Sequence, residues 1–239
     1  MPTLDRHLVS LTEPASFAAE QYQGLRLTIE RVARARDVKI IAITSPAAGD
    51  GKTVTAVNLA GALARGSDGR VLLIDADLRR PSVATLLGIE TTGPGLADVL
   101  SGNRDAAEVF RRIEPFNLSV LPAGATRAGG TEMLRSPRLE QLLQEARREY
   151  AYVVIDTPPL LPIFDASVLA KLADGVLMIV AANQTPRKLL AEALNLLDPA
   201  KVLGIVFNQD DRPLFGYYNS YSRYYREYFT DPTQIASGA

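Results

Sequence analysis

Short apolar segments alternate with longer amphipathic segments along most of the chain. The apolar segments predict six strands: Val38–Thr44, Arg70–Asp75, Leu118–Leu121, Tyr152–Asp156, Gly175–Val180 and Val202–Asn208. The amphipathic segments predict six helices: Pro14–Arg34, Lys52–Arg65, Gly95–Leu100, Thr131–Glu149, Ala166–Leu172 and Pro186–Leu197. Several strand segments are continuous apolar runs, which are typical of a parallel sheet covered by helices on both faces. The pattern therefore predicts a three-layer, doubly wound α/β fold with a mostly parallel sheet and functional groups at the carboxyl ends of its strands.

The same pattern divides the chain into three parts. Residues 1–35 are expected to form an N-terminal helical arm, in which Pro14 takes the first helical position. Residues 36–209 carry the strand–helix alternation, and residues 210–239 show neither a helical period nor a buried strand. The last part is therefore expected to be a flexible tail.

Composition excludes several classes of function. The 239 residues hold 26 Lys and Arg against 27 Asp and Glu, so no general attraction to nucleic acid is expected. There is no cysteine and the one histidine is His7, which excludes disulfides, thiolate metal sites and Ser-His-Asp triads. No apolar run reaches the length of about 18 residues that a membrane span needs, and the N-terminus has no signal-peptide pattern. A cytoplasmic protein without a nucleic-acid partner is expected.

A phosphate-binding loop is predicted at Ser45–Thr53, between the first strand and the helix that follows. Backbone N–H groups of such a loop wrap a β-phosphate, and the helix N-terminus adds partial positive charge. Lys52 would reach the β- and γ-phosphate oxygens, and the Thr53 hydroxyl would bind Mg²⁺. Pro46 stands where the strict motif has its first glycine. The loop candidates for nucleotide binding are Gly49, Asp50, Gly51, Lys52, Thr53 and Val54. The alternative is a plain glycine turn with a surface lysine.

Carboxylates follow two of the predicted strands. Asp75 and Asp77 would point to the same side of an extended segment, and Asp156 comes directly after an apolar run. Carboxylates at the end of a buried strand are costly without a cation or hydrogen-bond donors. The position of Asp156 is that of a Walker-B aspartate, which holds magnesium. Asp77 could instead cap the following turn and pair with Arg79 or Arg80.

Three segments together resemble the bacterial tyrosine kinase family, which belongs to the MinD/ParA-like branch of P-loop NTPases. They are Ser45–Thr53, Val71–Pro81 (VLLIDADLRRP) and Tyr152–Pro159 (YVVIDTPP). The similarity runs roughly from Glu20 to the tail, and a missing first loop glycine is common in this family. The resemblance implies ATP as phosphoryl donor, Mg²⁺ as cofactor and a tyrosine hydroxyl as acceptor. It also implies a role in capsule and exopolysaccharide polymerisation and export.

The resemblance also implies roles for individual residues. The catalytic candidates are Lys52, Asp75, Asp77 and Asp156, and the magnesium candidates are Thr53, Asp77 and Asp156. Asp75 is the best candidate for activating the tyrosine hydroxyl, although the division of roles between Asp75 and Asp77 stays open. Arg79 or Arg80 would stabilise charge on the phosphates, and Asn208 would recognise adenine.

Six of the nine tyrosines fall within twelve residues of the tail. They are Tyr217, Tyr218, Tyr221, Tyr224, Tyr225 and Tyr228. Each phosphate would add about −1.5 to −2 charges, and the resemblance implies autophosphorylation of this cluster between neighbouring subunits. The alternatives are an aromatic packing strip, a surface for a partner, or stacking of single-stranded nucleic acid.

The arm carries a partial match to a ring-forming motif of the same family, which spaces Glu, Arg and Arg three residues apart. Glu20 and Arg26 match, while Gln23 takes the middle position. These three residues are the predicted oligomer interface, and an amphipathic helix docking on the sheet is the alternative. The resemblance further implies a membrane polysaccharide co-polymerase as activator, a cognate tyrosine phosphatase, and a location at the inner face of the cell membrane through that activator.

Two other functions fit parts of the sequence. A MinD/ParA-type ATPase switch shares the fold, but Ala47 stands where such proteins place a second lysine. An inactive nucleotide-binding scaffold has no need for all the acidic and phosphate-loop residues found here. The sequence therefore predicts a protein-tyrosine autokinase, with the ATPase switch as the alternative.

Overall fold

The computed structural model describes residues 4–66, 69–125, 130–161 and 164–210. The chain divides into one compact unit, Met1–Gln209, and a second unit, Asp210–Ala239. The tail tyrosines between Tyr217 and Tyr228 lie outside the described residues. In the part of the chain that the structure describes, no helix has the length and apolar character that crossing a membrane requires.

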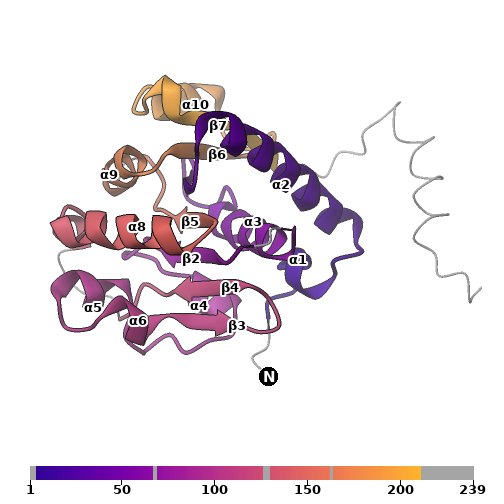
Figure 1. Cartoon of the computed structure of the whole chain (residues 1–239). Coiled ribbons are helices and arrows are strands. Elements are labelled where there is room, and N and C mark those ends of the chain that lie inside the picture. The colour runs from indigo at the N-terminus through magenta and orange to yellow at the C-terminus, as the bar shows by residue number, and fades with distance from the viewer. Residues whose placement is uncertain (1–3, 67–68, 126–129, 162–163, 211–239) are drawn as a thin grey trace, which may run out of the picture. The chain divides into compact units, whose positions relative to one another are not determined.

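The first unit is built on a seven-stranded sheet (Figure 1). Its spatial order is β3-β4-β2-β5-β1-β6-β7, and β3 and β4 are its antiparallel pair. The strands are β1 (Ile40–Thr44), β2 (Val71–Asp75), β3 (Arg111–Ile113), β4 (Leu118–Leu121), β5 (Tyr152–Asp156), β6 (Gly175–Ala181) and β7 (Val202–Asn208). The mostly parallel sheet expected from the continuous apolar runs is confirmed.

Helices cover both faces of this sheet (Figure 1). One face packs against α1 (Val9–Thr12), α2 (Phe17–Arg36), α3 (Lys52–Gly66) and α4 (Val83–Leu86). The other packs against α5 (Leu96–Ser101), α6 (Ala106–Val109), α7 (Gly130–Leu134), α8 (Pro137–Glu149), α9 (Asp165–Leu172) and α10 (Arg187–Leu194). A short 3₁₀ helix, Pro199–Lys201, precedes β7. Alternate residues of β1 enter different cores, since Ile40 packs on one face and Ile41 on the other. The fold is therefore three-layered and doubly wound, as predicted.

Two helix boundaries were predicted wrongly. The segment Thr131–Glu149 forms two helices, because Ser136 caps α8 by accepting the Arg138 N–H at 3.1 Å and Pro137 takes its first position. Pro14 does not begin the arm helix, which starts after Ser16, whose hydroxyl accepts the Ala19 N–H at 3.2 Å. The elements β3, α1, α4 and α6 were not predicted, since three or four residues are too few to show a period.

The N-terminal segment is tied to α3, the helix that follows the phosphate loop. Asn58 of α3 is fully buried and accepts the Ser10 N–H at 2.9 Å. Its amide group donates to the carbonyls of His7 and Val54, both at 2.9 Å. These bonds satisfy a buried amide and fix the residues around α1 against the core.

Candidate active site

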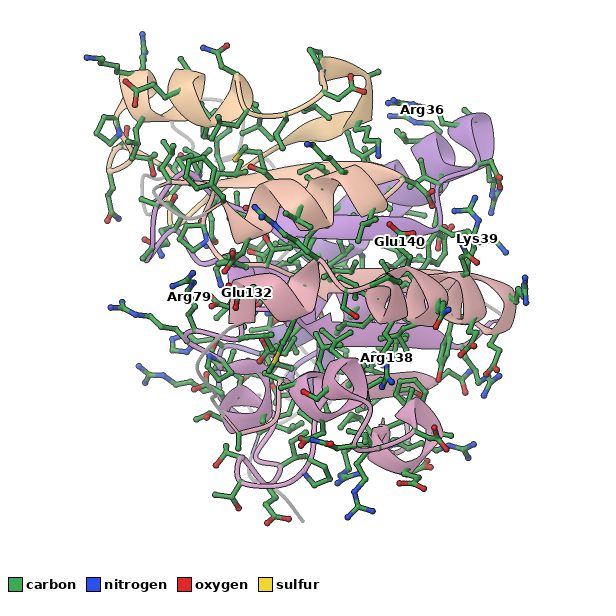
Figure 2. The ribbon with its side chains drawn as sticks, turned by 90° about the vertical axis from the view of Figure 1, so that its left-hand side faces the viewer. Arg36, Lys39, Arg79, Glu132, Arg138 and Glu140 are labelled. Atoms are coloured by element: carbon green, nitrogen blue, oxygen red, sulfur yellow. The ribbon has the colours of Figure 1, made fainter. Side chains whose placement is uncertain are left out.

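The strand register brings the predicted acidic residues together at one edge of the sheet. β2 and β5 are neighbours, and Asp75 is paired in register with Asp156. β1 lies on the other side of β5 and leads into the phosphate loop at the same edge. In Figure 2, Arg79, just beyond β2, lies at one end of the view and Lys39, just before β1, at the other. The two residues mark the carboxyl and amino edges of the sheet.

Two glycines of the phosphate loop adopt backbone angles that disfavour other residues. Gly49 has a φ of +95° and Gly51 a φ of +86°. A Cβ at Gly51 would lie 2.0 Å from the side-chain nitrogen of Asn208. The loop therefore needs glycine at 51 both for its turn and for the close approach of β7.

Side chains around the loop hold its backbone in place. The Asp50 carboxylate accepts the Ala47 N–H at 3.1 Å and the Thr185 hydroxyl at 2.7 Å. Asn208 donates to the Asp50 carbonyl at 3.0 Å, and Gln209 donates to the Gly49 carbonyl at 2.9 Å. The side chains of Asp50 and Asn208 thus bind the loop itself.

Lys52 lies between two carboxylates. Its Nζ is 3.0 Å from Asp77 Oδ2 and 3.6 Å from Asp156 Oδ1, and its side chain is only 12% exposed. Burial alone would lower the pKa of the Lys52 ammonium, but Asp156 and Asp77 outweigh it and raise that pKa above its usual value. Lys52 therefore stays charged and neutralises the acidic edge of the sheet.

Thr53 and Asp156 form an oxygen pair suited to magnesium. The Thr53 hydroxyl donates to Asp156 Oδ2 at 2.8 Å, while Asp156 Oδ1 has no hydrogen-bond partner in the described part of the chain. Burial raises the pKa of Asp156 to about 6, although Lys52 and the Thr53 hydroxyl lower it. The described residues contain no cluster of three or more His, Cys, Asp or Glu side chains that could hold a metal by themselves. The donor set therefore fits Mg²⁺ completed by phosphate oxygens and water.

Asp75 is engaged with the backbone of the loop after β2. Its carboxylate accepts the N–H groups of Asp77, Ser82 and Val83 at 3.2, 3.2 and 3.1 Å. Burial and the neighbouring Asp156 raise the pKa of Asp75 to about 8. These contacts show Asp75 anchoring the loop that presents Asp77.

A cavity of about 850 Å³ opens beside these groups. It is lined by Ala48, Gly49, Gly51, Lys52, Thr53, Val54, Asp77, Arg79, Arg80, Ser82, Leu86, Pro159 and Leu161. Its volume falls in the range of small-molecule sites. Most of the predicted nucleotide-binding residues face it, whereas Asp50, Asp75, Asp156 and Asn208 do not line it.

Arg79 has a partner that the sequence did not indicate. Its Nε donates to Asp165 at 2.9 Å, and the Asp165 side chain is 3% exposed. The only local signal for Asp165 is a carboxylate in the first turn of a helix, which is common in helices without any special role.

The predicted interface residues lie along α2. Arg26 donates to Gln23 at 2.9 Å and to Glu30 at 3.0 Å, with 16% of its side chain exposed. It also covers Gly66 at the end of α3, where a Cβ would lie 1.8 Å from the guanidinium. Glu20 is half-buried. Arg26 is thus engaged within its own chain.

The fold and the loop define a P-loop NTPase: a glycine loop between a buried strand and a helix, followed by Lys52 and Thr53, with a strand-end Asp156 beside them. A model of the AAA domain family matches residues 38–200. The chain is 35% identical to the tyrosine-protein kinase YwqD of Bacillus subtilis, over 91% of this chain and 93% of that protein. The chain therefore belongs to the bacterial tyrosine kinase family.

Two further relatives place the chain within that family. It is 32% identical to the succinoglycan biosynthesis transport protein ExoP of Rhizobium meliloti, over 98% of this chain but 31% of that protein. The kinase domain of the Escherichia coli tyrosine kinase ETK superposes with a TM-score of 0.80, at 27% identity over 91% of this chain and 87% of that one. The chain thus spans nearly all of YwqD and about a third of ExoP. These matches favour the kinase over the ATPase switch.

Proposed function

We propose that this chain is an ATP- and Mg²⁺-dependent protein-tyrosine kinase that phosphorylates tail tyrosines of neighbouring copies. The observation that carries the proposal is the position of Lys52, 3.0 Å from Asp77 at the wall of the nucleotide-sized cavity. The family of the chain and the six clustered tyrosines of its tail support the tyrosine acceptor.

The residues of the cavity have distinct proposed roles in the transfer. The loop N–H groups and Lys52 bind the β- and γ-phosphates, and Thr53 and Asp156 hold the magnesium. When bound, the magnesium neutralises charge on the phosphate oxygens. The bond between the γ-phosphorus and the β,γ-bridging oxygen breaks as the tyrosine oxygen bonds to that phosphorus. The products are phosphotyrosine and ADP, and the hydroxyl proton leaves to a carboxylate or to water.

Asp77 is the carboxylate best placed to receive that proton or to orient a magnesium-bound water. It lines the cavity, whereas Asp75 is turned into the protein and bonded to three backbone N–H groups. We assign Asp75 to the support of the loop that carries Asp77. The recognition of adenine by Asn208 is left out of this proposal, because the Asn208 amide is bonded to the Asp50 carbonyl.

The biological setting belongs to the same proposal. Phosphorylation of the tail would regulate capsule or exopolysaccharide polymerisation and export, in keeping with the name of ExoP. A membrane co-polymerase would activate the kinase at the inner face of the membrane, and a tyrosine phosphatase would reset it. A ring of subunits through Glu20, Gln23 and Arg26 requires Arg26 to exchange its contacts with Gln23 and Glu30 for contacts with a neighbour.

The test is phosphosite mass spectrometry of dephosphorylated full-length protein after incubation with Mg-ATP, with the cytoplasmic segment of the co-polymerase added. Phosphate is expected on residues of the segment Tyr217–Tyr228. A matched variant with all six tail tyrosines changed to phenylalanine should lose this signal, and Asp77→Asn should lower it at least tenfold, or about 1.4 kcal/mol in activation free energy. ATP hydrolysis without any phosphotyrosine would instead indicate the ATPase switch.

A further inference from the structure

Arg79 lies at the rim of the nucleotide cavity, in the turn that follows β2. It lines this cavity together with Lys52 and Thr53, and 51% of its side chain is exposed. Its Nε donates to Asp165, which begins α9 and lies 86 residues further along the chain. The contact therefore connects the loop after β2 to a separate helix across the mouth of the site.

The burial of Asp165 distinguishes this ion pair from ordinary surface pairs. Its side chain is 3% exposed, and its Oδ1 has no hydrogen-bond partner among the described residues. A buried carboxylate is costly unless a cation compensates it. The exposed pair Arg104–Glu108, with side chains 58% and 54% exposed, shows the contrast, because pairs of that kind contribute little. Arg79 is thus the cation that compensates a nearly inaccessible carboxylate.

The geometry of the bond determines what it can do. A guanidinium is planar and carries its N–H groups in a rigid fork, so a bond through Nε fixes the direction of the terminal nitrogens. Such a fork binds two oxygens of one phosphate at once when it is correctly oriented. We infer that Asp165 is a positioning residue, which orients Arg79 toward the phosphates of ATP. This inference rests on the proposed function, since it assigns Arg79 to the nucleotide of that site.

The test is a double-mutant cycle on the full-length protein with Asp165→Asn, Arg79→Ala and the double variant. Two quantities are measured for each protein: kcat and KM for ATP in tyrosine phosphorylation, and Kd for a fluorescent ATP analogue with Mg²⁺. Arg79→Ala is expected to lower kcat/KM by about 10- to 100-fold, and Asp165→Asn by about tenfold. The double variant should equal Arg79→Ala alone, because Asp165 acts only through Arg79.

The exposed pair provides the matched control. Arg104→Ala and Glu108→Gln remove a similar ion pair away from the cavity and should leave kcat/KM unchanged. Arg79→Lys keeps the charge but lacks the fork, so it should lose as much activity as Asp165→Asn. This variant leaves Asp165 in place and tests the inference even when Asp165→Asn does not fold.

Three results would overturn the inference: an unchanged kcat/KM in Asp165→Asn, full activity in Arg79→Lys, or a double variant that loses the product of the two single losses. The failure of the proposed function would look different. A wild-type protein that makes no phosphotyrosine but binds the ATP analogue would still give the cycle in Kd, and coupling between the two residues there would support the positioning role.

Discussion

Replacing Lys52 with methionine should destabilise the fold as well as remove the phosphate-binding charge. The methionine fills a similar volume, but it leaves Asp77 and Asp156 facing one another without the ammonium that lies 3.0 and 3.6 Å from them. At an effective dielectric constant of about 20, each of these contacts corresponds to about 5 kcal/mol of Coulomb attraction before desolvation. Removing one partner of a buried pair costs about 3–5 kcal/mol in net terms, which is the expected loss here.

The assay is urea unfolding followed by circular dichroism, with Lys188→Met on the exposed face of α10 as the control. With a slope of about 3 kcal/mol per molar urea, the loss corresponds to a fall of about 1–1.5 M in the midpoint. The control should shift the midpoint by less than about 0.2 M, because surface substitutions usually cost under about 0.5 kcal/mol.

The loss should also depend on pH in a defined direction. Burial raises the pKa of Asp156 to about 6 and that of Asp75 to about 8 from a usual 3.8, so the folded chain holds protons that the unfolded chain has released. Stability therefore falls as pH rises from about 4 to 8 in the wild type. Without Lys52 both pKa values rise further and the fall is steeper, so the loss in Lys52→Met should grow from pH 5 to pH 8. Equal midpoints for the two proteins at pH 8 would refute this reasoning.

Three further substitutions have expected outcomes. Asn58→Ala should cost about 2–3 kcal/mol and expose residues 4–12 to limited proteolysis, because it leaves buried backbone groups without partners. Gly51→Ala should raise the Kd for Mg-ATP at least tenfold, since its φ is +86° and its Cβ would lie 2.0 Å from the Asn208 side-chain nitrogen. Ser16→Ala should cost about 1 kcal/mol in urea unfolding without changing Kd, because it removes the N-cap of α2.

Each of these three has a distinct contrary result. Asn103→Ala, at an exposed position, is the control for Asn58→Ala, and equal protease resistance of the two would contradict the tie between α3 and the N-terminal segment. Gly24→Ala places its Cβ in open space, so a Kd in Gly51→Ala no higher than in Gly24→Ala would show that the loop tolerates a side chain. An unchanged unfolding midpoint in Ser16→Ala would mean that the cap contributes nothing measurable.

Much of the candidate site could be predicted because its signals are local. The run of apolar residues from Val153 to Ile155 predicts a buried strand, and Asp156 follows it directly. The phosphate loop stands between β1 and α3 in the same way. Parallel strands share one carboxyl edge, so placing each acid at a strand end was enough to predict that they meet.

The neighbouring acids were harder to separate. Alternation along an extended segment put Asp75 and Asp77 on the same side. The chain turns after Asp75, where Ser82 and Val83 bring their N–H groups to its carboxylate, and Asp77 is left beside the cavity. Sequence spacing could not show this, because the turn depends on hydrogen bonds to residues seven and eight positions away.

The sequence by itself determined the doubly wound sheet, the phosphate loop and the acidic strand ends, since each depends on the period and order of a few consecutive residues. Only the tertiary structure decided which acid faces the nucleotide cavity, that Asn58 fixes the N-terminal segment, and that Asp165 holds Arg79. These decisions are made by hydrogen bonds and ion pairs between residues 48 and 86 positions apart. No local pattern encodes such partners, because their meeting depends on how helices and strands pack once apolar surface is buried.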